Sequence, residues 1–315
     1  MQPKPNKIFW NLVFVGIIAA LFTLIYLSTS RINYNWNWER VVPYLIDTQP
    51  EIINAPLDGD IVKDAEGTLI LQSVSGDELM DLSHFKNLKV TAGDLVFEGD
   101  TLAEKSQWKL GTLSKGVIVT IQLSVISLVF AIVIGMFLAL MRLSSNIALR
   151  KLAVSYIELI RGTPLLVQIF IVYFFIGTVL DLERFTSGVV ALSMFTASYV
   201  AEIIRAGIQG IHKGQMEASR SLGMTYPQSM SYVILPQAFK QVLPPLAGQF
   251  INLIKDSSLV SVIAITDLTK AGREVVSGTF APFEVWITVA LLYLLLTGSL
   301  SWAIQALEKR LSVSD

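Results

Sequence analysis

Long apolar runs, separated by short polar breaks, dominate the chain after residue 111. An α-helix rises about 1.5 Å per residue, so about 20 apolar residues cross a hydrocarbon core of about 30 Å. We therefore predict that each of these runs forms, or contributes to, a membrane-spanning helix. The five predicted spans are Gly116–Met141, Leu165–Leu180 (the apolar part of a span entered through residues 158–164), Gly188–Gly210, Leu246–Ile265 and Phe283–Leu307.

A further apolar run, Ile8–Leu27, follows Lys4 and Lys7 near the N-terminus. A secretory signal usually has a shorter apolar region, followed by small residues at its cleavage site. Residues 28–30, Ser-Thr-Ser, are a weak site of that kind, so a cleaved signal is the alternative interpretation. We favour an uncleaved transmembrane anchor over residues 1–27. The predicted fold class is an all-α polytopic membrane protein with this anchor and five further spans.

Residues 28–111 differ in character from the rest of the chain. They hold fourteen acidic and seven basic side chains, and prolines and glycines interrupt them repeatedly. No run here is long enough to cross a bilayer, so we predict a soluble insert. Short apolar stretches between Gly and Asp turns predict strands at Gly67–Ser73, Leu88–Thr91 and Asp94–Glu98, which makes the insert β-rich.

Two features of the insert leave its role open. Trp36 and Trp38 have indole rings that suit a membrane interface, and packing against the insert explains them equally well. Residues 55–62 and 90–103 resemble the half-motifs of the biotinyl/lipoyl-type sandwich, without the Met-Lys-Met context of the cofactor-bearing lysine. That resemblance implies a β-rich module with no swinging arm.

Composition excludes several classes of function. The 315 residues are 53% hydrophobic and only 16% charged, whereas soluble domains carry about 25% charged residues. There is no cysteine, and the two histidines lie far apart in sequence, so we expect neither a disulfide nor a Cys- or His-rich metal site. A net charge of −1 gives no reason to expect nucleic-acid binding. No G-x-x-x-x-G-K-[S/T] loop occurs, so any nucleotide hydrolysis belongs to another chain.

Basic residues in the short loops predict the orientation of the chain, because such residues collect on the cytoplasmic side. The predicted spans place eleven of them on one side and three on the other. This puts both termini and residues 212–236 in the cytoplasm and residues 28–111 outside. The eleven are Lys4, Lys7, Arg142, Arg150, Lys151, Arg205, Lys213, Arg220, Lys240, Lys309 and Arg310, and the three are Arg184, Lys270 and Arg273.

Residues 212–236 form a polar island between apolar runs, and they carry a spaced motif. Glu217-Ala218-Ser219, then Gly223, then Val233-Ile234-Leu235-Pro236 fit the pattern E-A-A-x3-G-x9-I-x-L-P. The sequence departs from it only at Ser219, in place of Ala, and at Val233, in place of Ile. This stretch resembles the cytoplasmic coupling loop of the membrane subunits of ABC-type importers.

The local chemistry of this loop predicts two short helices. His212 or Gly214 opens the first, and Gly223 ends it with a positive φ. Thr225 and Gln228 fit a capping box for the second, which Leu235-Pro236 ends. Small side chains at Ala218 and Ser219 allow a partner to approach, and Glu217 is predicted to be a buried or capping carboxylate. The predicted ATPase-coupling residues are Gly214, Gln215, Glu217, Ala218, Ser219, Gly223, Leu235 and Pro236.

Further segments resemble one branch of that family, the permeases for polar amino acids. The similarity runs from about Gly116 to Lys309 and is carried by residues 158–168, 201–207, 214–215, 235–238 and 255–261. It implies a five-helix type I importer permease core over residues 112–315, in the cytoplasmic (inner) membrane, with no counterpart for the anchor and insert. It also implies a second permease subunit (homodimer or heterodimer), two ATPase subunits that bind ATP and Mg, and a periplasmic or tethered amino-acid-binding protein. We expect no cofactor in this chain and no catalytic residues.

Polar residues within the apolar runs are candidates for the substrate path, because intramembrane charges face partners or water. Glu202 and Arg205 lie three apart on one helical face and are expected to pair. Pro244-Pro245 is expected to break the fourth span. The alternative is that such groups hold helices together, which we prefer for Thr120, Ser124 and Ser127 and, as a helix-bridging pair, for Glu202 and Arg205. The path candidates are Lys255, Asp256, Ser257, Ser258, Gln168, Glu202 and Arg205.

Two rival functions remain open at this point. One is a membrane-anchored sensor or adaptor that reads a ligand with residues 28–111. The other is an ATP-independent channel or secondary transporter. Co-purification with an ATPase distinguishes both from an importer subunit.

Overall fold

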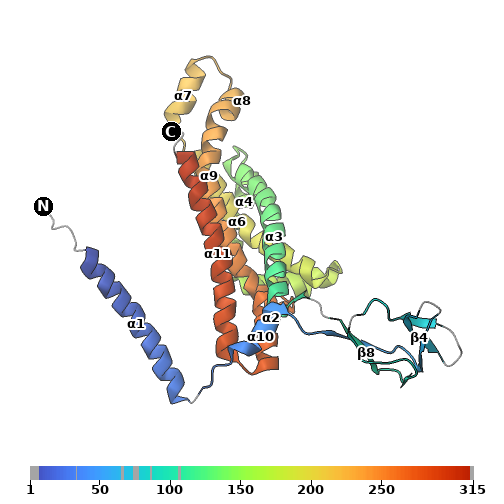
Figure 1. The fold of residues 1–315 in the computed structure, drawn as a ribbon. Coiled ribbons are helices and arrows are strands. Elements are labelled where there is room, and N and C mark those ends of the chain that lie inside the picture. The colour runs from blue at the N-terminus through green and yellow to red at the C-terminus, as the bar shows by residue number, and fades with distance from the viewer. Residues whose placement is uncertain are drawn as a thin grey trace.

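The computed structural model describes residues 7–32, 34–64, 67–73, 78–85, 87–105 and 108–312. These residues form three parts: a bundle of long helices, a small module of strands, and one helix at the N-terminal end (Figure 1). The module of strands lies at one end of the bundle. The short helices α7 and α8 extend from the other end, near the C-terminus (Figure 1).

The bundle contains the long helices α3 (Thr112–Leu143), α6 (Arg184–Gln209), α9 (Leu235–Asp256) and α11 (Pro282–Ser312). Of the described residues, Thr112–Leu143, Arg184–Gln209 and Pro282–Ala306 form helices long and apolar enough to cross a membrane. A bent pair, α4 (Ile147–Arg161) with residues 165–177, would make a fourth span. The protein is therefore mostly helical, with candidate membrane helices.

The predicted second span is not one straight helix. α4 ends at Arg161, and α5 (Leu165–Ile171) with the π-helical segment Val172–Gly177 continues at an angle of 106°. Pro164 has no N–H to donate and adopts an extended conformation (φ −63°, ψ 137°), so the helix cannot run through it.

The predicted break at Pro244-Pro245 is also wrong. α9 starts at Leu235, eleven residues before the predicted span, and runs through both prolines. Proline is tolerated in such helices where neighbouring helices support the backbone, and α9 lies against α6 and α11. α9 ends at Asp256, followed by a 3-10 segment (Ser257–Ile263) and the helix α10 (Leu268–Thr279), so the predicted span to Ile265 is too long.

The crossing of α3 and α6 forms the centre of the bundle. Gly135 makes it possible, because a Cβ atom there would lie 2.6 Å from Cγ1 of Val200. Two buried hydroxyls add cross-links, which confirms the predicted helix-bridging role for Ser127 and Thr120 but not for Ser124: Ser127 Oγ donates to Val189 O at 3.4 Å. Thr120 Oγ1 accepts from Leu268 N at 3.1 Å, and Ser124 Oγ donates to Thr120 O within α3.

The insert is a module of short antiparallel strands around a small apolar core of Ile61, Leu71, Leu82, Val96 and Leu102. In its described residues, β1 pairs with β9, a second sheet has the order β2-β8-β6, and a third has the order β5-β4-β3-β7. The strands are β1 (Ile46–Asp47), β2 (Glu51–Asn54), β3 (Gly59–Lys63), β4 (Leu69–Ser73), β5 (Glu78–Asp81), β6 (Asn87–Leu88), β7 (Leu95–Val96), β8 (Thr101–Lys105) and β9 (Lys109–Leu110).

Residues 34–45, which we call the collar, attach the insert to the bundle. The collar contains a 3-10 turn (Trp38–Arg40) and the short helix α2 (Val42–Leu45). Trp36 stacks on Trp38 with ring centroids 5.7 Å apart, and its ring lies 6.2 Å from that of Phe283 on α11. The two indoles therefore gather at the start of α11, not against the strands of the insert.

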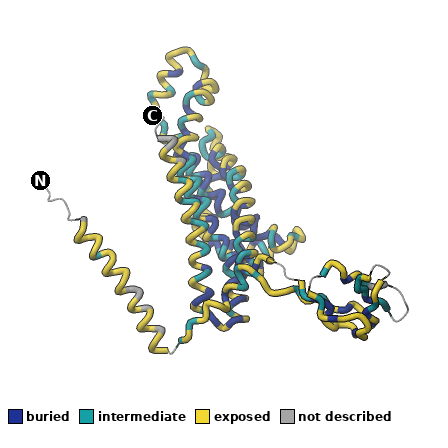
Figure 2. Tube along the Cα trace, viewed as in Figure 1, coloured by how far each residue is buried: buried dark blue, intermediate teal, exposed yellow. Residues whose placement is uncertain are grey.

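Helix α1 (Lys7–Arg31) diverges from the bundle toward its N-terminal end (Figure 1). None of its described side chains is buried (Figure 2). Its role as a membrane anchor remains a prediction.

Candidate functional site

The helices α7 (Lys213–Ser221) and α8 (Tyr226–Ser229) form a hairpin beyond the end of the bundle (Figure 1). His212 caps α7, accepting the N–H of Gly214 at its Nδ1 atom over 3.1 Å. Gly223 has φ +86°, as predicted for the residue that ends this helix. A side chain would strain the backbone at that angle, so the turn between the helices depends on glycine.

The second helix starts with the predicted capping box. Gln228 Oε1 accepts the Thr225 N–H at 2.8 Å, and Pro227 lies in the first turn. The prediction that Leu235-Pro236 ends this helix is wrong. A π-helical segment, Met230–Ile234, joins α8 to α9 without a break, and Pro236 stands directly after this segment as the second residue of α9.

Burial corrects the predicted roles of two hairpin residues. Ser219 is buried and donates its hydroxyl to Met216 O at 2.9 Å, so it does not present a surface to a partner. Glu217 is exposed and is neither buried nor the cap of α7. The reason is the helical period: α7 packs on the π-helical segment through the face that holds Met216 and Ser219. Ala218 is exposed, so it remains available for contact.

The tip of the hairpin exposes large apolar side chains. Leu222 is 84% exposed and Tyr226 is 58% exposed. Large apolar side chains exposed together at the tip of a polar loop are typical of a surface that a protein partner covers.

Polar contacts hold the hairpin in place. Gln237 of α9 donates to Gln215 of α7 at 3.4 Å, and also to Val233 O at 2.9 Å. Arg220 Nη1 donates to Met224 O at 2.9 Å across the turn. A hollow of about 340 Å³ lies where the hairpin meets the end of α6, lined by Ile208, Gln209, Ile211, His212, Lys213, Met216, Met230 and Ile234. A movement of the hairpin tip would therefore be passed from α7 to α9 through the hydrogen bond between Gln215 and Gln237.

Glu202 is the centre of a charged cluster near the hairpin end of the bundle. It pairs with Arg205 at 3.0 Å, as predicted, and also with Arg142 of α3, whose predicted place was a cytoplasmic loop. Arg205 donates in turn to Gln209 Oε1 at 2.5 Å. The cluster thus bridges α3 and α6, which agrees with the helix-bridging alternative.

Two hollows adjoin this cluster, with volumes of about 520 and 440 Å³. Both are lined by Arg161 and Glu202, and the Arg161 guanidinium lies 4.9 Å from the centre of the Tyr199 ring. A carboxylate within an apolar helix could have signalled the missed partner Arg142, because a half-buried charge such as that of Glu202 needs an opposite charge.

Gln168 holds the bend between α4 and α5. Its buried side-chain amide donates to Ile160 O at 2.7 Å and to Thr163 Oγ1 at 2.8 Å, and its Oε1 atom is buried with no partner. The bond to Ile160 O, with a further one to Thr163 O at 3.1 Å, satisfies carbonyl groups that the broken helix leaves free.

Lys255–Ser258 lies at the opposite end of α9 from the hairpin. Lys255 is exposed, Asp256 and Ser258 are half-buried, and Ser257 is buried and donates to Ile254 O at 2.8 Å. α9 rises about 30 Å between Leu235 and Lys255 at about 1.5 Å per residue. The structure therefore separates the predicted path residues, since Glu202 and Arg205 lie toward the hairpin.

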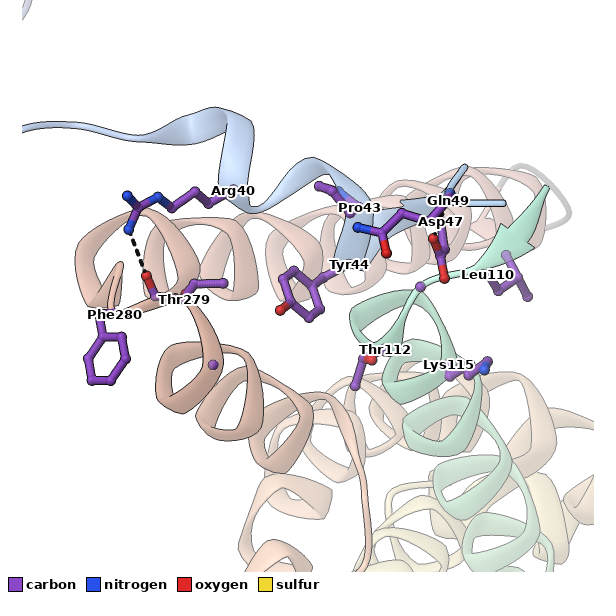
Figure 3. Close-up of a pocket in the computed structure, with 12 residues that line it drawn as sticks. Arg40, Pro43, Tyr44, Asp47, Gln49, Leu110, Thr112, Lys115, Thr279 and Phe280 are labelled. Carbon is purple, nitrogen blue, oxygen red and sulfur yellow. Dashed lines mark hydrogen bonds between the residues drawn. The ribbon is translucent and has the colours of Figure 1, made fainter. Parts of the chain in front are cut away.

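A cavity of about 500 Å³ opens where the collar meets α3 and α10 (Figure 3). Arg40 and Lys115 lie on opposite sides of it, and Asp47 adds a carboxylate (Figure 3). Arg40 Nη1 donates to Thr279 O, at the end of α10, over 3.1 Å. The sequence did not predict this cavity because its walls come from three separate segments, residues 40–49, 110–115 and 278–280. Among the described residues, no group of three His, Cys, Asp or Glu side chains is placed to hold a metal ion.

Residues 131–313 match the family described as binding-protein-dependent transport system inner membrane component. Among similar proteins, the probable glutamine ABC transporter permease GlnM of Bacillus subtilis (strain 168) is 47% identical over 62% of this chain and 91% of its own length. The glutamine transport system permease GlnP of Escherichia coli (strain K12) is 38% identical over 64% of this chain and 93% of its own. The L-cystine permease TcyB of Bacillus subtilis is 39% identical over 67% of this chain and 90% of its own.

Solved structures show the same arrangement of helices. An amino acid ABC transporter crystallised with histidines superposes with a TM-score of 0.60 at 43% identity, over 63% of this chain and 94% of that chain. An inward-facing form of the MetNI methionine ABC transporter gives a TM-score of 0.55 over 64% of this chain and 96% of that chain. Identity to that chain is 22%, so this second similarity concerns the fold alone.

Proposed function

The chain belongs to the family of binding-protein-dependent transport system inner membrane components and is a membrane permease subunit of an ABC importer. From this we propose that it translocates a polar amino acid. We also propose that it couples to its ATPase through the α7–α8 hairpin. Similar proteins are described as carriers of glutamine, cystine and arginine. The family is that of a transport subunit, and we assign ATP hydrolysis, with its Mg ion, to a partner chain.

The hairpin carries this proposal. Burying an exposed Leu or aromatic side chain is worth about 1.5–3 kcal/mol, so a partner that covers Leu222 and Tyr226 gains a substantial part of its affinity there. The Gly223 turn and the Thr225–Gln228 capping box fix the shape of the tip before the partner arrives. Little ordering of the loop then opposes binding.

We assign the chain to an assembly of two permease subunits, alike or related, with two ATPase subunits on the two hairpins. The absence of a phosphate-binding loop from this sequence supports a separate ATPase. When ATP draws the ATPases together, the hairpins move with them, and the tie from Gln215 to Gln237 passes the motion to α9. Access then alternates between two states that nucleotide biases.

We place the hairpin and both termini in the cytoplasm and the insert outside. The distribution of eleven basic residues against three supports this orientation. The hairpin and the insert lie at opposite ends of the bundle, as this topology requires (Figure 1). A binding protein, soluble or tethered, would then deliver its amino acid at the end that carries the insert.

We keep Lys255, Asp256 and Ser258 as candidates for the substrate path. An amino acid is a zwitterion, so its path needs cations and anions together, and this segment at the end of α9 offers both. Replacement of Lys255 by Ala is expected to lower uptake without loss of the ATPase. Unchanged uptake in vesicles would remove Lys255 from the path.

Co-purification of the ATPase subunit tests the proposal. Leu222→Asp places a charge on the exposed tip and should abolish the association, whereas Ser221→Ala, next to it, should retain it. Ser221 is a matched control because its hydroxyl only donates to Glu217 O within α7. Wild-type levels of ATPase on Leu222→Asp would refute docking at the tip.

A further inference from the structure

We propose that α1 docks antiparallel along the bare face of α11, with Gly16 against Gly298, as a sixth helix of the same subunit. The inference rests on the proposed topology, in which α1 crosses the membrane. It adds an intramolecular interface that holds the N-terminal helix to the permease core.

The collar brings the two helices together at one end. Tyr34 Oη donates to the Glu284 carboxylate, and the Tyr34 ring packs edge-on against Phe283 with centroids 4.6 Å apart. α1 ends at Arg31, so three residue steps, at most about 11 Å of chain, separate it from this fixed point. Packed helices lie about 8–10 Å apart, so this short tether allows the end of α1 to reach packing distance of the start of α11.

An exposed face continues along α11 from Phe283, where the collar packs, to Gly298. Ile287, Ala290, Leu294 and Gly298 are exposed and follow Phe283 at intervals of three or four residues, which places them on one side of the helix. α1 likewise has no buried side chain among those described. Both helices thus have apolar surface to cover.

Small residues on the two helices lie at similar distances, measured along each helix, from the end at which the collar joins them. Gly16 precedes Arg31 by 15 residues and Gly298 follows Pro282 by 16, so the two glycines lie about 22 and 24 Å from the collar end at about 1.5 Å per residue. A Cβ atom at either glycine would meet nothing within 4 Å, so both backbones are open to a neighbour. Small residues let helix backbones approach closely in a membrane, where packing drives association.

The same register aligns the remaining contacts. Thr23 falls opposite Ala290, and its hydroxyl already donates to Ala19 O at 2.8 Å, so it brings no unsatisfied group into the interface. Trp10 and Trp302, both exposed, lie about 30 Å from the collar end, which is the thickness of the hydrocarbon core. The indoles then share the inner interface, while Tyr34, Trp36 and Phe283 lie at the outer one.

Disulfide cross-linking in membranes containing the whole transporter tests this docking, and the natural chain offers no cysteine to interfere. We expect the double variant Gly16→Cys/Gly298→Cys to lose its free thiols on mild oxidation through a bond within one chain. The matched pair Ile18→Cys/Gly298→Cys has nearly the same depth but the opposite face of α1, and it should retain its thiols. Linked peptides recovered from the monomer by mass spectrometry identify the intramolecular bond, and amino acid uptake confirms that the variants fold.

Three results would overturn the proposal. A bond that forms only between two copies would assign the face of α11 to a second subunit. No bond, with the thiol at position 16 shielded from a water-soluble maleimide, would leave α1 in the membrane but away from α11. Ready labelling of that thiol by the maleimide would contradict the membrane topology itself, whatever the rest of the transporter does.

Discussion

Glu284 should control how firmly the insert is attached to the transporter. Its side chain is 0% exposed at the start of α11, and it accepts hydrogen bonds from Tyr34 Oη and, at 2.5 Å, from Asn37 N. These bonds tie the collar to the bundle across nearly 250 residues of sequence. We predict that replacing Glu284 opens the collar locally and leaves the bundle folded.

The two bonds set the size of the effect. A hydrogen bond to a charged group contributes about 1.5–3 kcal/mol, and a neutral one about 0.5–1.5 kcal/mol. Glu284→Gln keeps the shape and one acceptor oxygen for Asn37 N, while its NH2 group can only donate to the Tyr34 hydroxyl oxygen. Both bonds become neutral, so the variant should lose about 1 kcal/mol per bond, or about 2 kcal/mol in all. That corresponds to an opening constant about 30-fold larger, since every 1.4 kcal/mol is tenfold. Glu284→Ala should exceed it, because Tyr34 and Asn37 then keep unpaired donors.

Hydrogen exchange of the intact transporter measures this opening. The amides to follow are those of Val41, Tyr44 and Gly111, which donate to Trp38 O, Val41 O and Leu45 O. Exchange through local opening reports the opening constant. Glu274→Gln is the matched control, because the exposed Glu274 pairs with Lys270 at 3.2 Å at the surface and surface pairs contribute about 0–1 kcal/mol. Unchanged exchange in the collar of Glu284→Gln, or faster exchange throughout α11, would refute the reasoning.

Three more predictions follow from single contacts. At the hairpin turn, φ of residue 223 is +86°, so Gly223→Val should lower association with the ATPase. Gly223→Asn should largely retain it, because Asn tolerates a positive φ. Equal association of the two variants in a pull-down would show that the backbone angle is not the cause of the loss. In the core, Gly135→Ala should lower the midpoint of thermal unfolding, by an amount that corresponds to about 1–3 kcal/mol, because the new Cβ would meet Val200 at 2.6 Å. Gly248→Ala is the control and should leave the midpoint unchanged, because nothing lies within 4 Å of a Cβ there. Equal midpoints would argue against close packing of α3 and α6. In the collar, burial and the bond to Glu284 raise the pKa of Tyr34 from 10.0 to about 12, so its contribution is fully present below pH 10 and is lost as the pH rises through about 12. The difference in tyrosinate absorbance between wild type and Tyr34→Phe should locate that midpoint, and a value near 10 would show that Tyr34 is not held.

The hairpin could be predicted in detail because its signals are local. Gly223 ends a helix through its own φ, and Thr225 caps the next helix through a residue three positions on. Where burial decided the outcome, prediction failed. Ser219 was expected to face a partner and is buried, and Glu217 was expected to be buried or capping and is exposed. Which side of α7 faces the bundle depends on the path of α9, which the motif does not encode.

The bundle shows why proline alone does not define a helix boundary. Pro164 coincides with a bend of 106°, whereas Pro244 and Pro245 lie inside a continuous helix. The difference lies in their surroundings, since α6 and α11 pack along α9 and support its backbone. The hydropathy pattern also failed to predict the first half of α9, because this half is helical but contains polar residues.

The collar was beyond prediction because its contacts are long-range. One signal was available: Glu284 stands at the start of an apolar run, where a carboxylate needs a partner. The sequence alone gave no means of identifying that partner as Tyr34. The pairing of Arg142 with Glu202 could not be predicted either, because the two residues lie on different helices.

ATP-driven uptake by the reconstituted transporter tests the central claim most directly. Proteoliposomes would contain this permease with its ATPase and partner subunit, and a binding protein loaded with a polar amino acid would be added outside. We predict uptake that requires ATP inside, and its loss in Leu222→Asp but not in Ser221→Ala. Uptake that proceeds without the ATPase, or at the wild-type rate in Leu222→Asp, would contradict coupling through the hairpin.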